Sequence, residues 1–306
     1  MGTTWRVMIA SLPRGVQRAG LQADIEAILD RIDRGMSTWR ADSELSRFNA
    51  HAGTDWYPVS MDVATVVTAA LEVGRASGGA FDVTVEPLVE LWGFGRTRQA
   101  QRVPDPDAVA AARARVGYRM LHARTAPSAL RKDRPDLRVD LSAIAPGYAA
   151  DLIAAMLDRL GTHGYLIDVG GELFARGRNG SGQRWRVGVQ TPDAAPGRFQ
   201  AVVELHDRAM STSGDYRNFF EVDGVRYSHL IDPRRGRPVS SPLASVTVLA
   251  PDAMHANAWD TALMVLGPRA GPDLAQRLGI PAMFIARTPQ GLVADANPAL
   301  EEFLRR

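Results

Sequence analysis

The segment 210–236, MSTSGDYRNFFEVDGVRYSHLIDPRRG, is the part of the sequence that most constrains the fold. Two runs rich in aromatic and β-branched residues, FFEV and VRYSHL, flank Asp223 and Gly224. An Asp-Gly pair tolerates the positive φ angles of a tight type I′ turn, so the two runs are predicted to form a β-hairpin. The second strand carries His229 and Asp232 into a polar loop, where functional sites are commonly built. Taken alone, such a pair is more often structural than catalytic.

The remaining chain shows hydrophobic patterns of both helices and strands. Helices are predicted at 21–34, 61–77, 106–116, 149–160, 252–266 and 298–304. Strands are predicted at 5–12, 165–169, 185–190, 200–205, 244–249 and 282–286. The two kinds of element do not alternate regularly, and hairpins dominate the second half, so the fold class is α+β rather than a doubly wound parallel sheet. The proline-containing stretch 124–138 is predicted to be a surface excursion that resembles a linker.

Composition excludes several classes of function. The 306 residues carry a formal net charge of +2, and no Lys/Arg block has the density that phosphate tracking requires, so a nucleic-acid partner is not expected. The sequence has no cysteine, which excludes disulfides, thiol nucleophiles and cysteine-based metal sites. No apolar run approaches the roughly 20 residues of a membrane-spanning helix. The length suits either one large domain or two.

Three oxygen-bearing residues recur at helical spacing in the predicted helix 252–266. Asn257, Asp260 and Thr261 stand at positions i, i+3 and i+4, so their side chains share one face. Oxygen ligands suit Mg²⁺, which is a hard cation. The alternative is a polar cluster that stabilises the first turns of the helix, and the spacing alone favours that alternative.

Several common catalytic motifs are missing. No G-x-G-x-x-G follows a predicted strand, and no G-x-x-x-x-G-K-[ST] occurs, so neither a Rossmann nor a P-loop nucleotide site is supported. A G-x-S-x-G element is absent as well.

Seven sequence elements, in order along the chain, resemble those of the ApbE family, the FAD:protein FMN transferases. Besides TSGDY and SHLIDP in 210–236, they are MGTTW (1–5), MSTWRADSELSRFN (36–49), GGAFDVTVEPLVELWGFG (78–95), VDLSAIAPGYAADL (139–152), IDVGGELFARG (167–177) and NAWDTALMVLG (257–267). The resemblance covers nearly the whole chain, except an arginine-rich stretch at 96–138 and about the last forty residues.

The resemblance implies a fold and a reaction. Residues 1–306 would form a single two-lobed domain, related to the T-fold, with FAD in the groove between the lobes. The reaction would be the Mg²⁺-dependent transfer of FMN from FAD to a threonine or serine hydroxyl of an acceptor flavoprotein, with release of AMP. His229 would accept the hydroxyl proton, because an unperturbed imidazole can do so near neutral pH. Asp232 and Ser228 would orient that site.

The resemblance also implies which residues bind the metal and FAD. Mg²⁺ would be held by the side chains of Asn257, Asp260 and Thr261 and by the backbone carbonyl of Ala143, with Asp260 contributing to catalysis. FAD would contact Met1, Trp39, Ala80, Phe81, Asp82, Asp140, Pro146 and Ile231. The 167–177 element is interpreted as packing. Two positions depart from the family pattern. Pro146 stands where relatives usually have lysine or sometimes glutamate, and Asn257 stands where many have aspartate.

Two other functions remain open. Without an acceptor, water could attack the same phosphorus, which would make the protein an FAD pyrophosphatase. The departures at Pro146 and Asn257 make a non-catalytic FAD-binding protein the other alternative. Many family members are exported and lipid-anchored, with a signal segment before the MGT element. We therefore expect a periplasmic protein at the inner-membrane face if such a segment has been removed, and a cytoplasmic protein otherwise.

Overall fold

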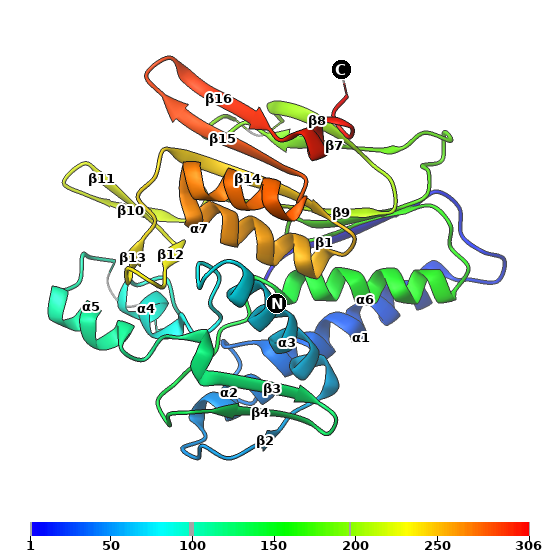
Figure 1. Ribbon diagram of the computed structural model, residues 1–306. Helices are drawn as coiled ribbons and strands as arrows, with labels where there is room; N and C mark the ends of the chain where they lie inside the picture. The colour runs from blue at the N-terminus through cyan, green and yellow to red at the C-terminus, as the bar shows by residue number, and fades with distance from the viewer. Residues whose placement is uncertain (1, 98–100, 196, 306) are drawn as a thin grey trace.

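The computed structural model describes residues 2–97, 101–195 and 197–305. Its centre is a seven-stranded sheet in the order β1-β5-β6-β9-β14-β15-β16, in which all neighbours run antiparallel (Figure 1). The strands are β1 (Trp5–Ile9), β5 (Tyr165–Val169), β6 (Glu172–Arg176), β9 (Arg208–Gly214), β14 (Leu243–Ala250), β15 (Ala282–Thr288) and β16 (Gly291–Ala296). The mixture of this sheet with helices confirms the predicted α+β class.

Each face of the large sheet is covered by a different kind of element. Side chains alternate between the two faces of a strand, so Tyr165 and Ile167 of β5 pack with the helices while Leu166 packs on the opposite side. The helices that pack on the sheet are α6 (Ala145–Arg159) and α7 (Ala253–Leu278), and α1 (Arg18–Met36) and α3 (Met61–Ala76) pack on those two helices. The opposite face is covered by β7 (Trp185–Gln190), β8 (Phe199–Leu205) and α8 (Pro298–Glu301).

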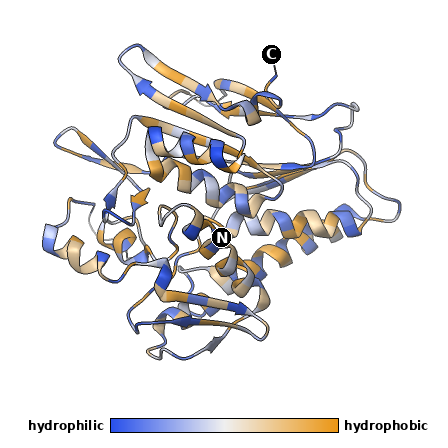
Figure 2. Cartoon of the chain, viewed as in Figure 1, coloured by the Kyte–Doolittle hydropathy of each residue, from blue (hydrophilic) through white to orange (hydrophobic). Residues whose placement is uncertain are grey.

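The helix α7 is longer than the predicted segment 252–266. It continues to Leu278 through a kink at Gly267, whose φ of 83° interrupts the helical backbone before Pro268. Figure 2 shows hydrophobic and hydrophilic residues on this helix and on α1 and α6, as expected for helices that bury one side. No helix in the described part of the chain is both long enough and apolar enough to span a membrane.

Smaller elements form the other side of the molecule. A three-stranded sheet, in the order β2-β4-β3, contains β2 (Tyr57–Pro58), β3 (Leu121–Thr125) and β4 (Ser128–Lys132). α2 (Glu44–Ala50) and the short 3₁₀ helix at Tyr118–Met120 lie beside it. A separate cluster contains α4 (Glu86–Leu91), α5 (Pro106–Arg113) and the pair β12 (Ile231–Asp232) and β13 (Arg237–Pro238). The predicted hairpin is confirmed as β10 (Phe219–Val222) and β11 (Val225–Ser228), with positive φ at Asp223 and Gly224.

The prediction of a linker-like excursion at 124–138 is wrong. β4 is the central strand of the three-stranded sheet, and its residues Leu130 and Lys132 are completely buried. Lys132, the single lysine of the sequence, donates to the carbonyl oxygens of Phe48, Asn49 and Leu137 at 3.2, 3.3 and 3.3 Å. A lysine is normally a sign of exposure, but here the ammonium group satisfies two carbonyls at the end of α2 and one in the segment after β4.

We expect Lys132→Met to destabilise the protein by about 2–3 kcal/mol, because three buried carbonyls would lose their donor. Urea denaturation followed by circular dichroism measures the change in the free energy of unfolding. Arg186→Met in strand β7, which removes an exposed cation, is the control and should change it by less than about 0.5 kcal/mol. An unchanged urea midpoint for Lys132→Met would contradict this interpretation.

Candidate active site

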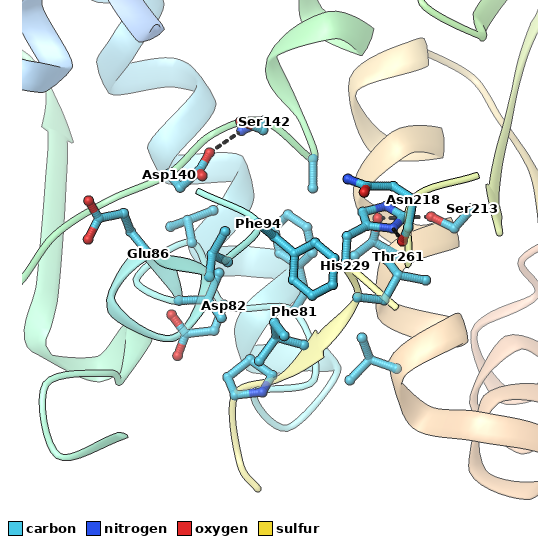
Figure 3. A pocket seen from close by; sticks show the side chains of 18 of the residues that line it. Phe81, Asp82, Glu86, Phe94, Asp140, Ser142, Ser213, Asn218, His229 and Thr261 are labelled. Atoms are coloured by element: carbon cyan, nitrogen blue, oxygen red, sulfur yellow. Dashed lines mark hydrogen bonds between the residues drawn. The ribbon is translucent and has the colours of Figure 1, made fainter. Parts of the chain in front are cut away.

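A cleft with a cavity volume of about 380 Å³ gathers most of the predicted site residues. The predicted FAD contacts that line it are Trp39, Ala80, Phe81, Asp82, Asp140 and Ile231. His229 and the predicted metal ligands Ala143, Asn257, Asp260 and Thr261 line it as well. Figure 3 shows Asp140 and Glu86 on one side of this cleft, and His229, Ser213 and Thr261 on the other. Pro146, another predicted FAD contact, lies in the first turn of α6 and does not line the cleft. Met1 lies outside the residues that the structure describes.

The loop that follows α3 brings Ala80, Phe81 and Asp82 to the cleft. Gly78 and Gly79 have φ angles of 64° and 80°, which turn the chain away from the helix end. The carboxylate of Asp82 accepts hydrogen bonds from the N–H of Thr84 at 2.8 Å, its hydroxyl at 2.6 Å and the N–H of Tyr118 at 2.8 Å. This carboxylate therefore shapes the loop.

Asp140 lies where a second chain segment joins this loop. Its N–H donates to the carbonyl of Val83 at 2.7 Å, and its carboxylate accepts from the N–H of Ser142 at 2.8 Å. These bonds hold the segment that leads from Asp140 through Ala143 into α6 against the wall of the cleft.

The helix α7 presents the predicted metal ligands from a firmly held N-terminus. Asp252 caps the helix by accepting from the N–H of His255 at 2.8 Å. Asp151 of α6 accepts from the N–H groups of Ala253 and Met254 at 2.7 and 2.9 Å. The first four N–H groups of a helix have no hydrogen-bond partner within that helix. The bonds to Asp252 and Asp151 therefore stabilise the first turn of α7 and fix α7 on α6. Burial raises the pKa of Asp151 to about 7.

Asp260 is 1% exposed and is surrounded by hydroxyl groups. It accepts hydrogen bonds from Ser211 at 2.5 Å, from Ser213 at 3.0 Å and from Thr261 at 3.2 Å. Ser211 also contacts the carboxylate of Glu172, which enters the cleft from β6. Ser211 and Ser213 share one face of β9, since strand residues alternate.

Burial controls the protonation of the two acidic groups in this cluster. It raises the pKa of Asp260 to about 7, although the hydrogen bonds from Ser211 and Ser213 act in the opposite direction. Burial also raises the pKa of Glu172, and the neighbouring charge of Asp260 adds to that effect. A divalent cation bound beside them would favour their ionised forms.

The donor set on α7 fits a magnesium ion. The side-chain oxygen Oδ1 of Asn257 is buried and has no hydrogen-bond partner in the described structure. A buried oxygen without a partner costs free energy, and a cation would satisfy it. Asn257, Asp260 and Thr261 all line the cleft. The described residues contain no group of three His, Cys, Asp or Glu that could hold a metal, so the donors here are mainly neutral oxygens. These residues, one carboxylate and several neutral oxygens, are therefore suited to bind a hard cation.

His229 has a defined tautomer. Its backbone N–H and its ring nitrogen Nδ1 both lie 3.0 Å from the carbonyl oxygen of Asn218. A carbonyl can only accept, so Nδ1 carries a proton and Nε2 keeps its lone pair. Burial lowers the pKa of His229, which keeps the ring neutral at neutral pH. Phe94 lies at its edge, with ring centroids 6.5 Å apart.

Asp232 and Ser228 do not orient His229 directly. The Asp232 carboxylate binds the guanidinium of Arg234 at 2.9 and 3.0 Å. The hydroxyl of Ser228 is buried and has no hydrogen-bond partner in the described structure. The carbonyl of Asn218, which lies just before β10, has the orienting role that sequence reasoning expected of these two residues.

Sequence reasoning also missed Glu172, Ser211, Ser213 and Arg217, which the structure places in or beside the cleft. Two signals could have indicated some of them. The serines of MSTSG stand two residues apart in a strand, so both must face the same side. Glu172 follows two glycines and precedes an apolar run, an unusual place for an acidic residue.

Comparisons with known proteins identify the family of this chain. The sequence model of the ApbE family matches residues 1–284. A protein of Klebsiella pneumoniae named FAD:protein FMN transferase is 44% identical, over 99% of this chain and 87% of its own length. The structure of the flavin transferase ApbE from Vibrio cholerae superposes with a TM-score of 0.92 at 39% identity, over 99% of this chain and 96% of that one. The apo form of the flavinyl transferase ApbE from Pseudomonas stutzeri gives 0.91 at 42% identity, over 99% of this chain and 94% of that one. On the family match and these identities, the chain belongs to the ApbE family.

Proposed function

We propose that this protein transfers FMN from FAD to a threonine or serine hydroxyl of an acceptor flavoprotein, releasing AMP, in a Mg²⁺-dependent reaction. The observation that carries the proposal is the composition of one cleft. It contains a neutral imidazole with a free Nε2 and, on α7, an oxygen cluster with an unpartnered amide oxygen. The names of the relatives, FAD:protein FMN transferase, support FAD as the donor and a protein as the acceptor.

In this proposal His229 accepts the proton of the attacking hydroxyl at Nε2. The hydrogen bond from Nδ1 to the Asn218 carbonyl holds the ring in the required orientation. General-base catalysis by a positioned side chain contributes about 10²–10⁴-fold in rate. The remaining acceleration comes from holding the hydroxyl and the diphosphate in line inside the cleft.

Asn257, Asp260, Thr261 and the carbonyl of Ala143 would hold the magnesium ion. When bound, the ion supplies charge neutralisation for the diphosphate and the departing AMP. Ser211 and Ser213 keep the Asp260 carboxylate oriented through their hydrogen bonds. Trp39, which is 57% exposed, offers an aromatic face at the mouth of the cleft on which a ring of FAD can stack.

Incubation of the protein with FAD, Mg²⁺ and a candidate flavoprotein domain tests the proposal. We expect flavin fluorescence that survives denaturation of the acceptor, an equal amount of AMP, and neither product when Mg²⁺ is chelated. FMN and AMP formed at the same rate without any acceptor would instead indicate an FAD pyrophosphatase. Intact FAD after incubation with Mg²⁺ and acceptor would indicate a non-catalytic binding protein.

We expect Pro146→Lys to strengthen FAD binding about fivefold, because it restores the lysine that relatives usually have at this position, and one favourable charge interaction at a partly exposed site is worth roughly 1 kcal/mol. Quenching of flavin fluorescence measures the dissociation constant. Pro146→Ala removes the ring without adding charge, so it should bind FAD as the wild type does. Equal dissociation constants for the wild type and Pro146→Lys would show that this departure from the family pattern has no effect on binding.

A further inference from the structure

Arg217 lies in the sequence between Ser213, which contacts the oxygen cluster on α7, and His229, the proposed base. It follows Ser213, which binds Asp260 and Thr261 at 3.0 and 3.1 Å. It directly precedes Asn218, whose carbonyl orients His229. Its side chain lines the same cleft. The segment that joins β9 to β10 therefore carries a guanidinium group into the cleft, where its Nη1 lies 4.0 Å from the place that a β-carbon on Gly171, the neighbour of Glu172, would occupy.

Arg217 forms no ion pair in the described structure. By contrast, Arg226 and Arg287 pair with Asp193 at 3.3 and 2.7 Å. Arg217 instead donates to the side-chain oxygen of Gln190 at 3.2 Å and lies over the ring of Tyr216, 6.0 Å from its centroid. Both contacts are neutral, so they hold the guanidinium in place without cancelling its charge.

The cleft has few other cations. Among its described lining residues only Arg96, Arg217 and the neutral His229 carry basic side chains. Arg96 is adjacent to Glu86 and Glu90, since all three line one side cavity. Arg217 is the cation on the side of Glu172, whose pKa it acts to lower. A diphosphate that meets two acidic groups, Glu172 and Asp260, requires positive charge on that side.

We propose that Arg217 is a further catalytic residue, which binds the phosphate of the departing AMP; this inference rests on the proposed function. In the reaction the acceptor oxygen forms a bond to the FMN phosphorus, and the bond from that phosphorus to the bridging oxygen breaks. The electron pair leaves with the bridging oxygen on AMP, and the hydroxyl proton passes to His229. The phosphate of AMP therefore gains negative charge, and the planar fork of a guanidinium matches phosphate oxygens.

Arg217→Ala tests the inference with the full-length protein, Mg²⁺ and an acceptor that the wild type modifies. We expect kcat for FMN transfer to fall about 100-fold, as when one preorganised donor is removed from a developing anion. Free guanidinium should restore part of the rate, and Arg217→Lys should be intermediate because lysine lacks the fork. Calorimetry with AMP, without Mg²⁺, should show about tenfold weaker binding to Arg217→Ala.

A second substrate identifies the group on which Arg217 acts. The p-nitrophenyl ester of FMN has a leaving group without a phosphate, so Arg217→Ala and the wild type should use it at rates within threefold of each other. If Arg217→Ala lost the same factor in kcat with both substrates, the assignment to AMP would be overturned. A kcat of Arg217→Ala with FAD equal to that of the wild type, or an unchanged affinity for AMP, would overturn it as well. Arg124→Ala is the matched control, because Arg124 also lies over an aromatic ring, Trp56, but outside the cleft. If the wild type itself transfers no FMN, the proposed function fails rather than this inference.

Discussion

Replacing His229 with alanine is expected to lower the rate of FMN transfer by about 10³-fold, with FAD and Mg²⁺ saturating. The rate should fall because the substitution removes the proton acceptor, Nε2. The hydrogen bond from Nδ1 to the Asn218 carbonyl leaves Nε2 unprotonated in the wild type. FAD affinity should change little, since the base acts on the acceptor hydroxyl. Stopped assays of covalent flavin fluorescence measure the rate. Transfer by His229→Ala at the wild-type rate would show that another group is the base.

The pH dependence gives an independent check of the same assignment. Burial lowers the pKa of His229, so the ring stays neutral down to a pH below its ordinary value of 6.5. With Mg²⁺ saturating, so that Asp260 is ionised, the wild-type kcat/KM should therefore rise with pH through a step below 6.5 and then stay level. In His229→Ala this step should disappear. His122→Ala is the control, because His122 is bound to Asp133 outside the cleft and should leave the step unchanged.

Replacing Asp260 with asparagine is expected to abolish Mg²⁺ binding and to lower transfer by about 10³-fold. Asp260 is the carboxylate among the proposed ligands on α7, and Asn257 and Thr261 are neutral. Calorimetric titration with Mg²⁺ in the presence of FAD measures the binding. Asp136→Asn removes an exposed carboxylate paired with Arg134 and should bind Mg²⁺ normally. Normal Mg²⁺ binding by Asp260→Asn would exclude Asp260 as a ligand.

The same substitution should not destabilise the metal-free protein at pH 8. In the folded state burial raises the pKa of Asp260 to about 7, from an ordinary value of 3.8. The folded state therefore holds this proton more tightly than the unfolded state, and the contribution of Asp260 to stability falls as the pH rises from 4 to 7. Asparagine removes the buried charge, so we expect roughly 1–3 kcal/mol of added stability at pH 8 and none at pH 4. Thermal melts at the two pH values measure the difference.

Local features of the sequence were sufficient for the parts of the site that lie close together along the chain. The positive φ angles at Asp223 and Gly224 follow from residue type, so the hairpin could be predicted. The shared face of Asn257, Asp260 and Thr261 follows from helical geometry in the same way. The roles of residues 80–82, 140 and 143 came from the family resemblance, because no local rule assigns them.

Contacts between distant segments could not be predicted in this manner. Glu172, Ser211 and Asp260 come from β6, β9 and α7, and they meet because β6 and β9 are neighbours in the sheet and α7 packs on it. The order of strands in an antiparallel sheet depends on packing across the whole domain. Lys132 shows the same limit, since its burial depends on carbonyls that lie more than eighty residues earlier in the chain.

Residue type and spacing alone thus specified the hairpin that carries His229 and the helical face that carries Asp260. Both arise from backbone geometry within a few residues. Only the tertiary structure revealed that the two face one cleft, that Asn218 orients the imidazole, and that Arg217 has no acidic partner in the described structure. These properties depend on burial and on distances between elements, which a linear pattern does not encode.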